Sequence, residues 1–119
     1  MIYITQLIYI KENQEEVFDD FEKVAIPIIS KYNGKMMLRI RPDKNSVIEA
    51  SVEQPYEIHV VSFETESDFK NFMADEERKK YVHLKDQSVK TVLLFKGEKY
   101  GSWFPWCRVF CLPDFDFLV

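Results

Sequence analysis

The sequence predicts a single α+β domain of the ferredoxin-like type, in which two helices cover one face of a four-stranded antiparallel sheet. Three observations support this prediction. The chain has 119 residues, which is enough for one domain and too few for a two-domain cofactor enzyme. Its composition, 46% hydrophobic and 30% charged, is that of a folded protein rather than a disordered one. Strand-like and helix-like segments follow one another in the order β-α-β-β-α-β.

The first strand and helix account for residues 2–33. Residues 2–10 alternate, with isoleucines on one face and Tyr3, Thr5, Leu7 and Tyr9 on the other. Asn13 and Glu16 have capping-box spacing, and apolar residues then recur at helical spacing as far as Tyr32. Pro27 predicts a kink or break near residues 25–26, and the Asn33-Gly34 pair predicts the end of this helix.

The middle of the chain predicts a strand, a long connection and another strand. Residues 35–41 place Met36, Leu38 and Ile40 on one side and Met37, Arg39 and Arg41 on the other. Residues 42–55 form a polar connection whose centre, SVIEAS, has the composition of a short extra strand or a flap. Residues 56–63 form the next strand, with Ile58 and Val60 opposite to a set made of His59, Val61 and Phe63.

The last elements complete the domain. Thr65 and Asp68 have capping spacing at the start of a helix whose apolar stripe is Phe69, Phe72 and Met73. A turn and a further helical segment follow over residues 75–85, and residues 89–95 form the fourth strand. Two right-handed crossovers then place both helices on one face of the sheet. Residues 1–99 are therefore predicted to be one domain and residues 100–119 a tail.

The face of the sheet without helices is predicted to be apolar. Alternation places on it six residues: Tyr3, Leu7, Tyr9, Met37, Val61 and Phe63. A surface of this kind is unfavourable in water. We therefore expect a second copy of the chain to cover it, as a two-fold homodimer packed sheet to sheet.

The chain resembles a known family in several segments. These are the run PIISKYNGK at residues 27–35, the Arg39-bearing strand, the strand over residues 56–63 and the helix start at residues 67–69. Over roughly residues 2–98 it resembles the small bacterial domain-of-unknown-function family thirteen-thirty, of the dimeric α/β-barrel superfamily. This resemblance implies a ferredoxin-like protomer and a homodimeric barrel. Its relatives include antibiotic-biosynthesis monooxygenases, haem-degrading enzymes and muconolactone isomerase-like proteins.

The main candidate ligand-binding set is Tyr3, Tyr9, Arg39, Arg41 and His59. Alternation predicts that these side chains share the face opposite to the aliphatic one, inside the barrel cavity. Arginine binds carboxylates and phenolates, histidine exchanges a proton near neutral pH, and tyrosine donates to an oxyanion. The alternative is that Arg39 and Arg41 only pair with acidic residues such as Glu57, and that His59 is a hydrogen-bonded sheet residue.

His83 is a second, weaker catalytic candidate beside His59. In the haem-degrading relatives a histidine near the end of the equivalent helix ligates iron. Those enzymes also use a tryptophan, and residues 1–99 contain none. The alternative is a surface histidine on a basic helix, and we expect no cofactor.

Other motifs favour structural roles. The acidic groups at residues 15–16, 19–20 and 75–77 lie at predicted helix starts, where carboxylates complement the helix dipole. The three glycines form no phosphate-binding loop, and no nucleophile elbow is present. Cys107 and Cys111 supply only half of a structural zinc site, so no metal is expected.

The tail over residues 100–119 contains seven of the 18 aromatic residues and both tryptophans. Three arrangements are open: it packs on its own protomer, it crosses to a partner, or it is partly disordered. We expect an arm that packs on the barrel or its partner.

Charge and composition narrow the function. A net charge of −4 without a basic stripe argues against nucleic acid, and no apolar run is long enough to span a membrane. The start of the chain lacks signal-peptide features, so a cytoplasmic protein with reduced thiols is expected. The sequence favours a small protein that binds an organic or anionic metabolite in a cavity lined by the sheet. The alternatives are a cofactor-independent monooxygenase or isomerase, and a non-catalytic dimerisation module.

Overall fold

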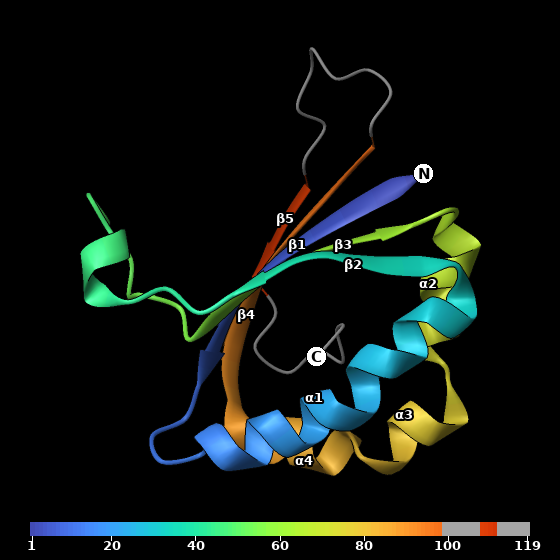
Figure 1. Ribbon diagram of the computed structural model, residues 1–119, viewed down its shortest axis with the longest axis horizontal. Helices are drawn as coiled ribbons and strands as arrows, with labels where there is room; N and C mark the ends of the chain where they lie inside the picture. The colour runs from blue at the N-terminus through green and yellow to red at the C-terminus, as the bar shows by residue number, and fades with distance from the viewer. Residues whose placement is uncertain (99–107, 112–119) are drawn as a thin grey trace.

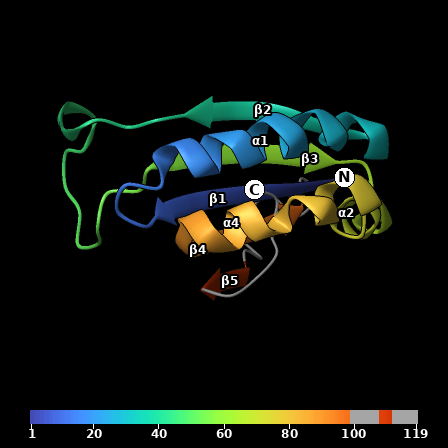
Figure 2. The same ribbon diagram turned by 90° about the horizontal axis from the view of Figure 1, so that it is seen from below.

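The described part of the computed structural model, residues 1–98 and 108–111, contains one antiparallel sheet with helices on one side (Figures 1 and 2). The strand order within these residues is β2-β3-β1-β4-β5. The elements are β1 (Ile2–Ile10), α1 (Glu15–Ile29), β2 (Gly34–Ile40), β3 (Glu57–Phe63), α2 (Glu66–Met73), α3 (Glu76–Lys80), α4 (Val82–Ser88), β4 (Val89–Glu98) and β5 (Arg108–Cys111). Strands β1 to β4 confirm the predicted ferredoxin-like fold.

Strand β5 adds a fifth strand to the four that were predicted. It pairs antiparallel with β4, where Leu93 lies opposite Cys111 and Lys96 lies opposite Arg108. The rest of the aromatic tail, residues 99–107 and 112–119, lies outside the described residues. The three arrangements considered for it therefore stay predictions, as does the division of the chain at residue 99.

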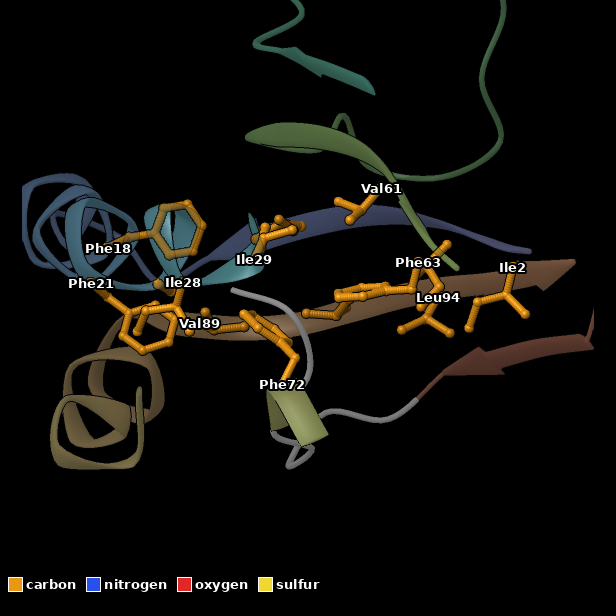
Figure 3. Close-up of a cluster of buried hydrophobic side chains, with 14 residues drawn as sticks. Ile2, Phe18, Phe21, Ile28, Ile29, Val61, Phe63, Phe72, Val89 and Leu94 are labelled. Atoms are coloured by element: carbon orange, nitrogen blue, oxygen red, sulfur yellow. The ribbon is translucent and has the colours of Figure 1, made fainter. Parts of the chain in front are cut away.

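The hydrophobic core lies between the sheet and the helices. Helix α1 contributes Phe18, Phe21, Ala25, Ile28 and Ile29, which belong to the predicted apolar stripe and are all buried. Figure 3 shows the phenylalanines and isoleucines of this set packing with Phe72 of α2 against residues of β1, β3 and β4. The phenyl ring centroids of Phe63 and Phe72 are 5.6 Å apart, within the usual range for aromatic pairs.

Helix α1 departs from the prediction at its start and at Pro27. Asn13 does not cap it, because Asn13 has a positive φ of 64° and the N-cap position falls at Gln14, without a side-chain cap. Pro27 does not break the helix, which continues to Ile29 and passes into a 3₁₀ turn at Ser30–Tyr32. Asn33 then adopts the left-handed conformation with φ 58° and ends the helical segment, as predicted.

Two other local predictions have different outcomes. Thr65 caps α2 as predicted, because its hydroxyl oxygen accepts a hydrogen bond from the Asp68 backbone N–H at 3.1 Å. The SVIEAS segment forms no strand. The β2–β3 connection instead contains a 3₁₀ turn at Lys44–Ser46 and projects away from the helices, at the left of Figure 1.

A β-bulge in β2 decides which side chains face the helices. Met36 lies opposite Val61, whereas Leu38, two positions later, lies opposite Val60, so one extra residue is inserted. Arg39 consequently lies opposite His59. Met36 and Leu38, predicted on one side of the strand, thus lie on opposite faces.

The predicted polar and apolar faces of β3 were wrong. Val61 and Phe63 were expected on the uncovered face, but both are fully buried beneath the helices together with Glu57 and His59. The uncovered face instead carries Ile58 and Val60, with Leu38, Ile40 and Leu7 as their cross-strand neighbours. Leu93 lies next to Leu7 on the same face. Alternation separates the side chains of β3 into two sets, but it does not show which set lies on the same face as the isoleucines of β1.

None of the helices in residues 1–98 and 108–111 has the length and apolar character needed to cross a bilayer.

Candidate functional site

A buried cluster of charged residues lies between α1 and the sheet. Glu22 projects from α1, Glu57 and His59 from β3, and Arg39 from β2. Glu22, Glu57 and His59 are at most 1% exposed, although all three carry ionisable groups. Burial of such groups is costly unless they pair with one another. The cluster is therefore a specific arrangement rather than a solvated surface.

The histidine ring contacts both carboxylates. His59 Nε2 lies 3.1 Å from Glu22 Oε2 and is hydrogen-bonded to Glu57 Oε2. The imidazole thus bridges a helix and its own strand. Because one ring nitrogen faces two carboxylates, the cluster can hold a proton or a cation at their meeting point.

Two arginines enclose the carboxylates from the β2 side. Arg39 lies 3.2 Å from Glu22 Oε1 through its terminal nitrogen and 3.1 Å from Glu57 Oε2 through Nε. Arg41 Nε donates to Glu57 Oε1 at 2.8 Å, and its terminal nitrogen lies 2.6 Å from Asp19 Oδ1. Both guanidiniums are partly exposed, so each links the buried cluster to the surface.

The pKa values of the buried groups are displaced in different directions. Burial, assisted by the neighbouring Glu57 carboxylate, raises the pKa of Glu22 to about 7. Burial also opposes ionisation of Glu57, but hydrogen bonds with His59, Glu22 and Arg39 outweigh it and hold its pKa well below the ordinary range. Burial would lower the pKa of His59, yet its contacts with Glu22 and Glu57 raise it. Glu57 is thus ionised at neutral pH, His59 favours its protonated form, and Glu22 exchanges its proton near neutral pH.

The arginines respond to the same charges. Partial burial alone would lower the pKa of Arg39 and of Arg41, but the hydrogen bond from each to Glu57 raises it above its ordinary value. Both guanidiniums therefore stay charged and balance the carboxylates of the cluster.

A cavity of about 300 Å³ borders this cluster at Arg41. It lies between the end of β1 and the β2–β3 connection and is lined by Tyr9, Ile10, Arg41, Pro42, Glu53, Gln54, Pro55 and Tyr56. The Arg41 guanidinium carbon lies 4.6 Å from the centre of the Tyr56 ring, a cation–π distance. The Tyr9 hydroxyl donates to the Glu53 backbone carbonyl at 2.8 Å and so ties the connection to the sheet.

The tyrosines of the cavity are held neutral. Burial and the nearby Glu53 carboxylate raise the pKa of Tyr9. Burial raises the pKa of Tyr56 to about 12; Arg41 opposes the rise and Asp19 supports it. Both phenols therefore act as hydrogen-bond donors at neutral pH.

The structure brings together four of the five predicted ligand-binding residues. Arg39, Arg41 and His59 meet in the cluster, and Tyr9 lies with Arg41 on the wall of the cavity. Arg39, Arg41 and His59 lie on the helix side of the sheet, not on the uncovered face, where they were expected. Tyr3 is separate, because it pairs with Ser62 on the uncovered face. The ion pairs named in the alternative interpretation are present, because Arg39 and Arg41 both pair with Glu57. Ligand binding by either arginine stays a prediction.

The second histidine lies elsewhere. His83 is exposed on α4 and is not part of the cluster. Its possible role in catalysis stays a prediction.

Sequence reasoning missed Glu22 and Gln6. Glu22 falls within the apolar stripe of α1, one turn after Phe18 and one turn before Ala25, and Gln6 alternates with Ile4 and Ile8 on the buried face of β1. A polar residue at core spacing was the available signal. This signal alone could not identify Glu22 and Gln6 as parts of a site, because Glu57 and His59 were predicted on the opposite face of the sheet.

Comparison with solved structures shows the same fold. An RPA0582 protein of unknown function from Rhodopseudomonas palustris has a TM-score of 0.69 at 12% identity, over 81% of this chain and 79% of that one. The Arabidopsis thaliana protein At3g17210 has a TM-score of 0.66 at 14% identity, over 85% and 97% of the two chains.

An uncharacterised NIPSNAP domain protein from Burkholderia xenovorans is similar as well. Its TM-score is 0.62 at 9% identity, over 85% of this chain and 96% of that one. No family model and no curated protein matches the sequence. The ferredoxin-like α+β fold is thus shared with proteins of unknown function, and the resemblance to family thirteen-thirty stays a prediction.

Proposed function

We propose that this protein binds a small organic anion, a carboxylate or a phenolate, in the cavity lined by Tyr9, Arg41 and Tyr56. The observation that carries the proposal is the position of Arg41, which lines the cavity and holds its guanidinium 4.6 Å from the ring centre of Tyr56, another lining residue. The volume of about 300 Å³ is at the lower end of the range for small-molecule sites. Tyrosine and proline side chains supply apolar walls for the body of such a molecule.

The contacts of Arg41 leave it able to exchange one partner. Its Nε is fixed by the buried Glu57, whereas its terminal nitrogen contacts Asp19, whose side chain is 34% exposed. A solvent-exposed ion pair of this kind contributes only about 0–1 kcal/mol. A ligand carboxylate can therefore replace Asp19 at little cost, while Glu57 keeps the guanidinium in place.

The test compares benzoate with its neutral isostere benzamide in an NMR titration of the full chain. We expect benzoate to shift the resonances of Tyr9, Tyr56 and the β2–β3 connection, and benzamide to do so much more weakly. Arg41→Gln should remove the preference for the anion, whereas Lys44→Gln, an exposed cation in the same connection, should keep it. Equal responses to the two probes, or none at tens of millimolar, would contradict the proposal.

We also propose a homodimer in which the uncovered sheet face is the interface. Leu38 is 47% exposed and Ile40 42% exposed on this face, beside Ile58 and Val60. An apolar face of this kind is self-complementary, so a second copy can cover it through a two-fold axis. This is the assembly implied by the resemblance to the dimeric α/β barrels. We also propose that the protein is located in the cytosol.

A further inference from the structure

The buried cluster contains a set of ligand atoms suited to a metal ion. The carboxylate oxygens of Glu22 and Glu57 and a ring nitrogen of His59 all lie within 4.8 Å of one another. All three side chains are at most 1% exposed, unlike the surface carboxylates that commonly cluster without a function. They come from two different elements, α1 and β3, so their convergence depends on the tertiary fold.

The two carboxylates are oriented in the same way. Each directs one oxygen, Oε2, toward His59 Nε2, while its other oxygen, Oε1, lies against a guanidinium. The arginine contacts hold the carboxylates in this orientation, as outer hydrogen-bond partners do for metal ligands. Arg39 Nε also reaches Glu57 Oε2 at 3.1 Å and is the group that a bound ion would have to displace.

A second, independent observation comes from the neighbouring strand. Gln6 of β1 lies directly opposite His59 of β3, and both are fully buried on the helix side. Within the described part of the chain neither amide atom of Gln6 has a hydrogen-bond partner, and neither does His59 Nδ1. Buried polar atoms without partners are rare and call for an explanation, such as a bound ion or a catalytic role.

Metal ligation would account for these atoms together. A histidine that binds a metal through one ring nitrogen almost always donates a hydrogen bond from the other. The unpaired amide oxygen of Gln6, the cross-strand neighbour of His59, is the group that would accept that bond. The set would then consist of three ligands and one supporting residue.

The surrounding charges limit the kind of ion. The guanidiniums of Arg39 and Arg41 already balance the carboxylates of Glu22 and Glu57, so simple charge attraction for a cation is weak. Binding of an ion must therefore gain free energy from a direct bond to the imidazole nitrogen. First-row transition metals form such bonds readily, whereas Mg²⁺ and Ca²⁺ do not.

We propose that Glu22, Glu57 and His59 form a site for a divalent transition-metal ion such as Zn²⁺, with Gln6 as the partner of His59 Nδ1. Three protein ligands leave one coordination position of a tetrahedral ion free. The site is distinct from the anion-binding cavity and does not depend on ligand binding there.

The experiment is calorimetric titration of the chelator-treated full chain with Zn²⁺, Co²⁺ and Mg²⁺. We expect one Zn²⁺ or Co²⁺ per chain, visible absorption from bound Co²⁺, and no binding of Mg²⁺. Glu22→Gln and His59→Gln should abolish binding, and Gln6→Leu should weaken it by roughly 10- to 100-fold. His83→Gln, which removes the exposed histidine, and the double change Cys107→Ser with Cys111→Ser should leave it intact.

A measurement on the unaltered protein covers the case in which the cluster variants do not fold. Bound Co²⁺ should produce its largest paramagnetic NMR shifts at His59 and at the neighbouring Ile4 and Val61 methyl groups. Shifts centred on His83 or on the two cysteines would overturn the proposal. So would a Kd for Zn²⁺ weaker than about 1 mM, or binding that survives His59→Gln.

Discussion

At the scale of single residues, the molecule places polar side chains at positions whose spacing is that of the core. Gln6, Glu22, Glu57 and His59 each occupy a buried position beside apolar neighbours of the same element. Their burial is compatible with folding because Arg39 and Arg41 reach the carboxylates from the edge strand. Removing one charged partner would leave a buried charge unpaired. The cost of that unpaired charge exceeds the stabilisation that the ion pair provides.

Tyr56 should be the residue with the clearest alkaline titration. Its pKa is about 12 in the folded chain, against an ordinary value of 10.0. In this interval the folded state keeps the phenolic proton and the unfolded state loses it, so stability contributed by Tyr56 is complete below pH 10 and is lost as pH rises toward 12. The absorbance of tyrosinate, recorded for the unaltered protein and for Tyr56→Phe, gives the titration of Tyr56 by difference. A difference curve centred near 10 would contradict the assignment.

Gly34 should not tolerate a side chain. A Cβ atom added there would lie 2.6 Å from Ile29 Cγ2, 2.7 Å from Phe63 Cε1 and 2.8 Å from the Ile29 backbone oxygen. The backbone oxygen cannot move without displacing the end of α1. We expect Gly34→Ala to lower the free energy of unfolding by about 1–3 kcal/mol, measured in urea at fixed protein concentration. Lys35→Ala, at the exposed next position, is the control and should change it by less than about 0.5 kcal/mol.

At the scale of elements, local signals predicted the existence of helices and strands better than their ends. Thr65 capped α2 as its spacing with Asp68 indicated, whereas Asn13 and Glu16, with the same spacing, did not cap α1. The difference lies in the backbone. Thr65 is extended, as an N-cap residue must be, and Asn13 has a positive φ.

The cap of α2 should be measurable because this helix spans only Glu66–Met73. Thr65→Ala removes the oxygen that accepts from the Asp68 N–H and should reduce the free energy of unfolding by about 1 kcal/mol. Thr65→Ser retains a hydroxyl oxygen and should recover most of this loss. Urea unfolding of the three proteins checks the expectation, and an equal loss in both variants would show that the hydroxyl is not the stabilising group.

At the scale of the whole molecule, the order and spacing of the elements were enough to predict the ferredoxin-like fold. Connection lengths and the handedness of crossovers leave few other topologies. The charged site was predicted only in part, because it depends on the relative phase of three strands. The sequence of a single strand shows which side chains share a face, but it does not show which of the two faces packs against the helices. The bulge near Met36 changes that phase without leaving a recognisable signal in the sequence.

The homodimer prediction also belongs to this scale. If the uncovered sheet face is the interface, Leu38→Lys should place two charges in it and shift the protein to a monomer. Light scattering measures the change. Val52→Lys is the matched control, because Val52 is 59% exposed in the β2–β3 connection and not on the sheet. A dimer that persists in Leu38→Lys would indicate another interface, and a monomeric unaltered protein would exclude a dimer altogether.

Because β2 contains the bulge, the number of residues between Gly34 and Leu38 determines which side chains of this strand face the helices and which face away from them. In a chain with one residue fewer between Gly34 and Leu38, composition and net charge would be almost unchanged, yet the leucine and isoleucine that now face outward would turn inward. The two arginines would turn outward and leave Glu22 and Glu57 buried without counter-charges. A single-residue deletion there would thus exchange the inside and outside of the strand, and an alignment that ignored the gap would record no change in any of these side chains.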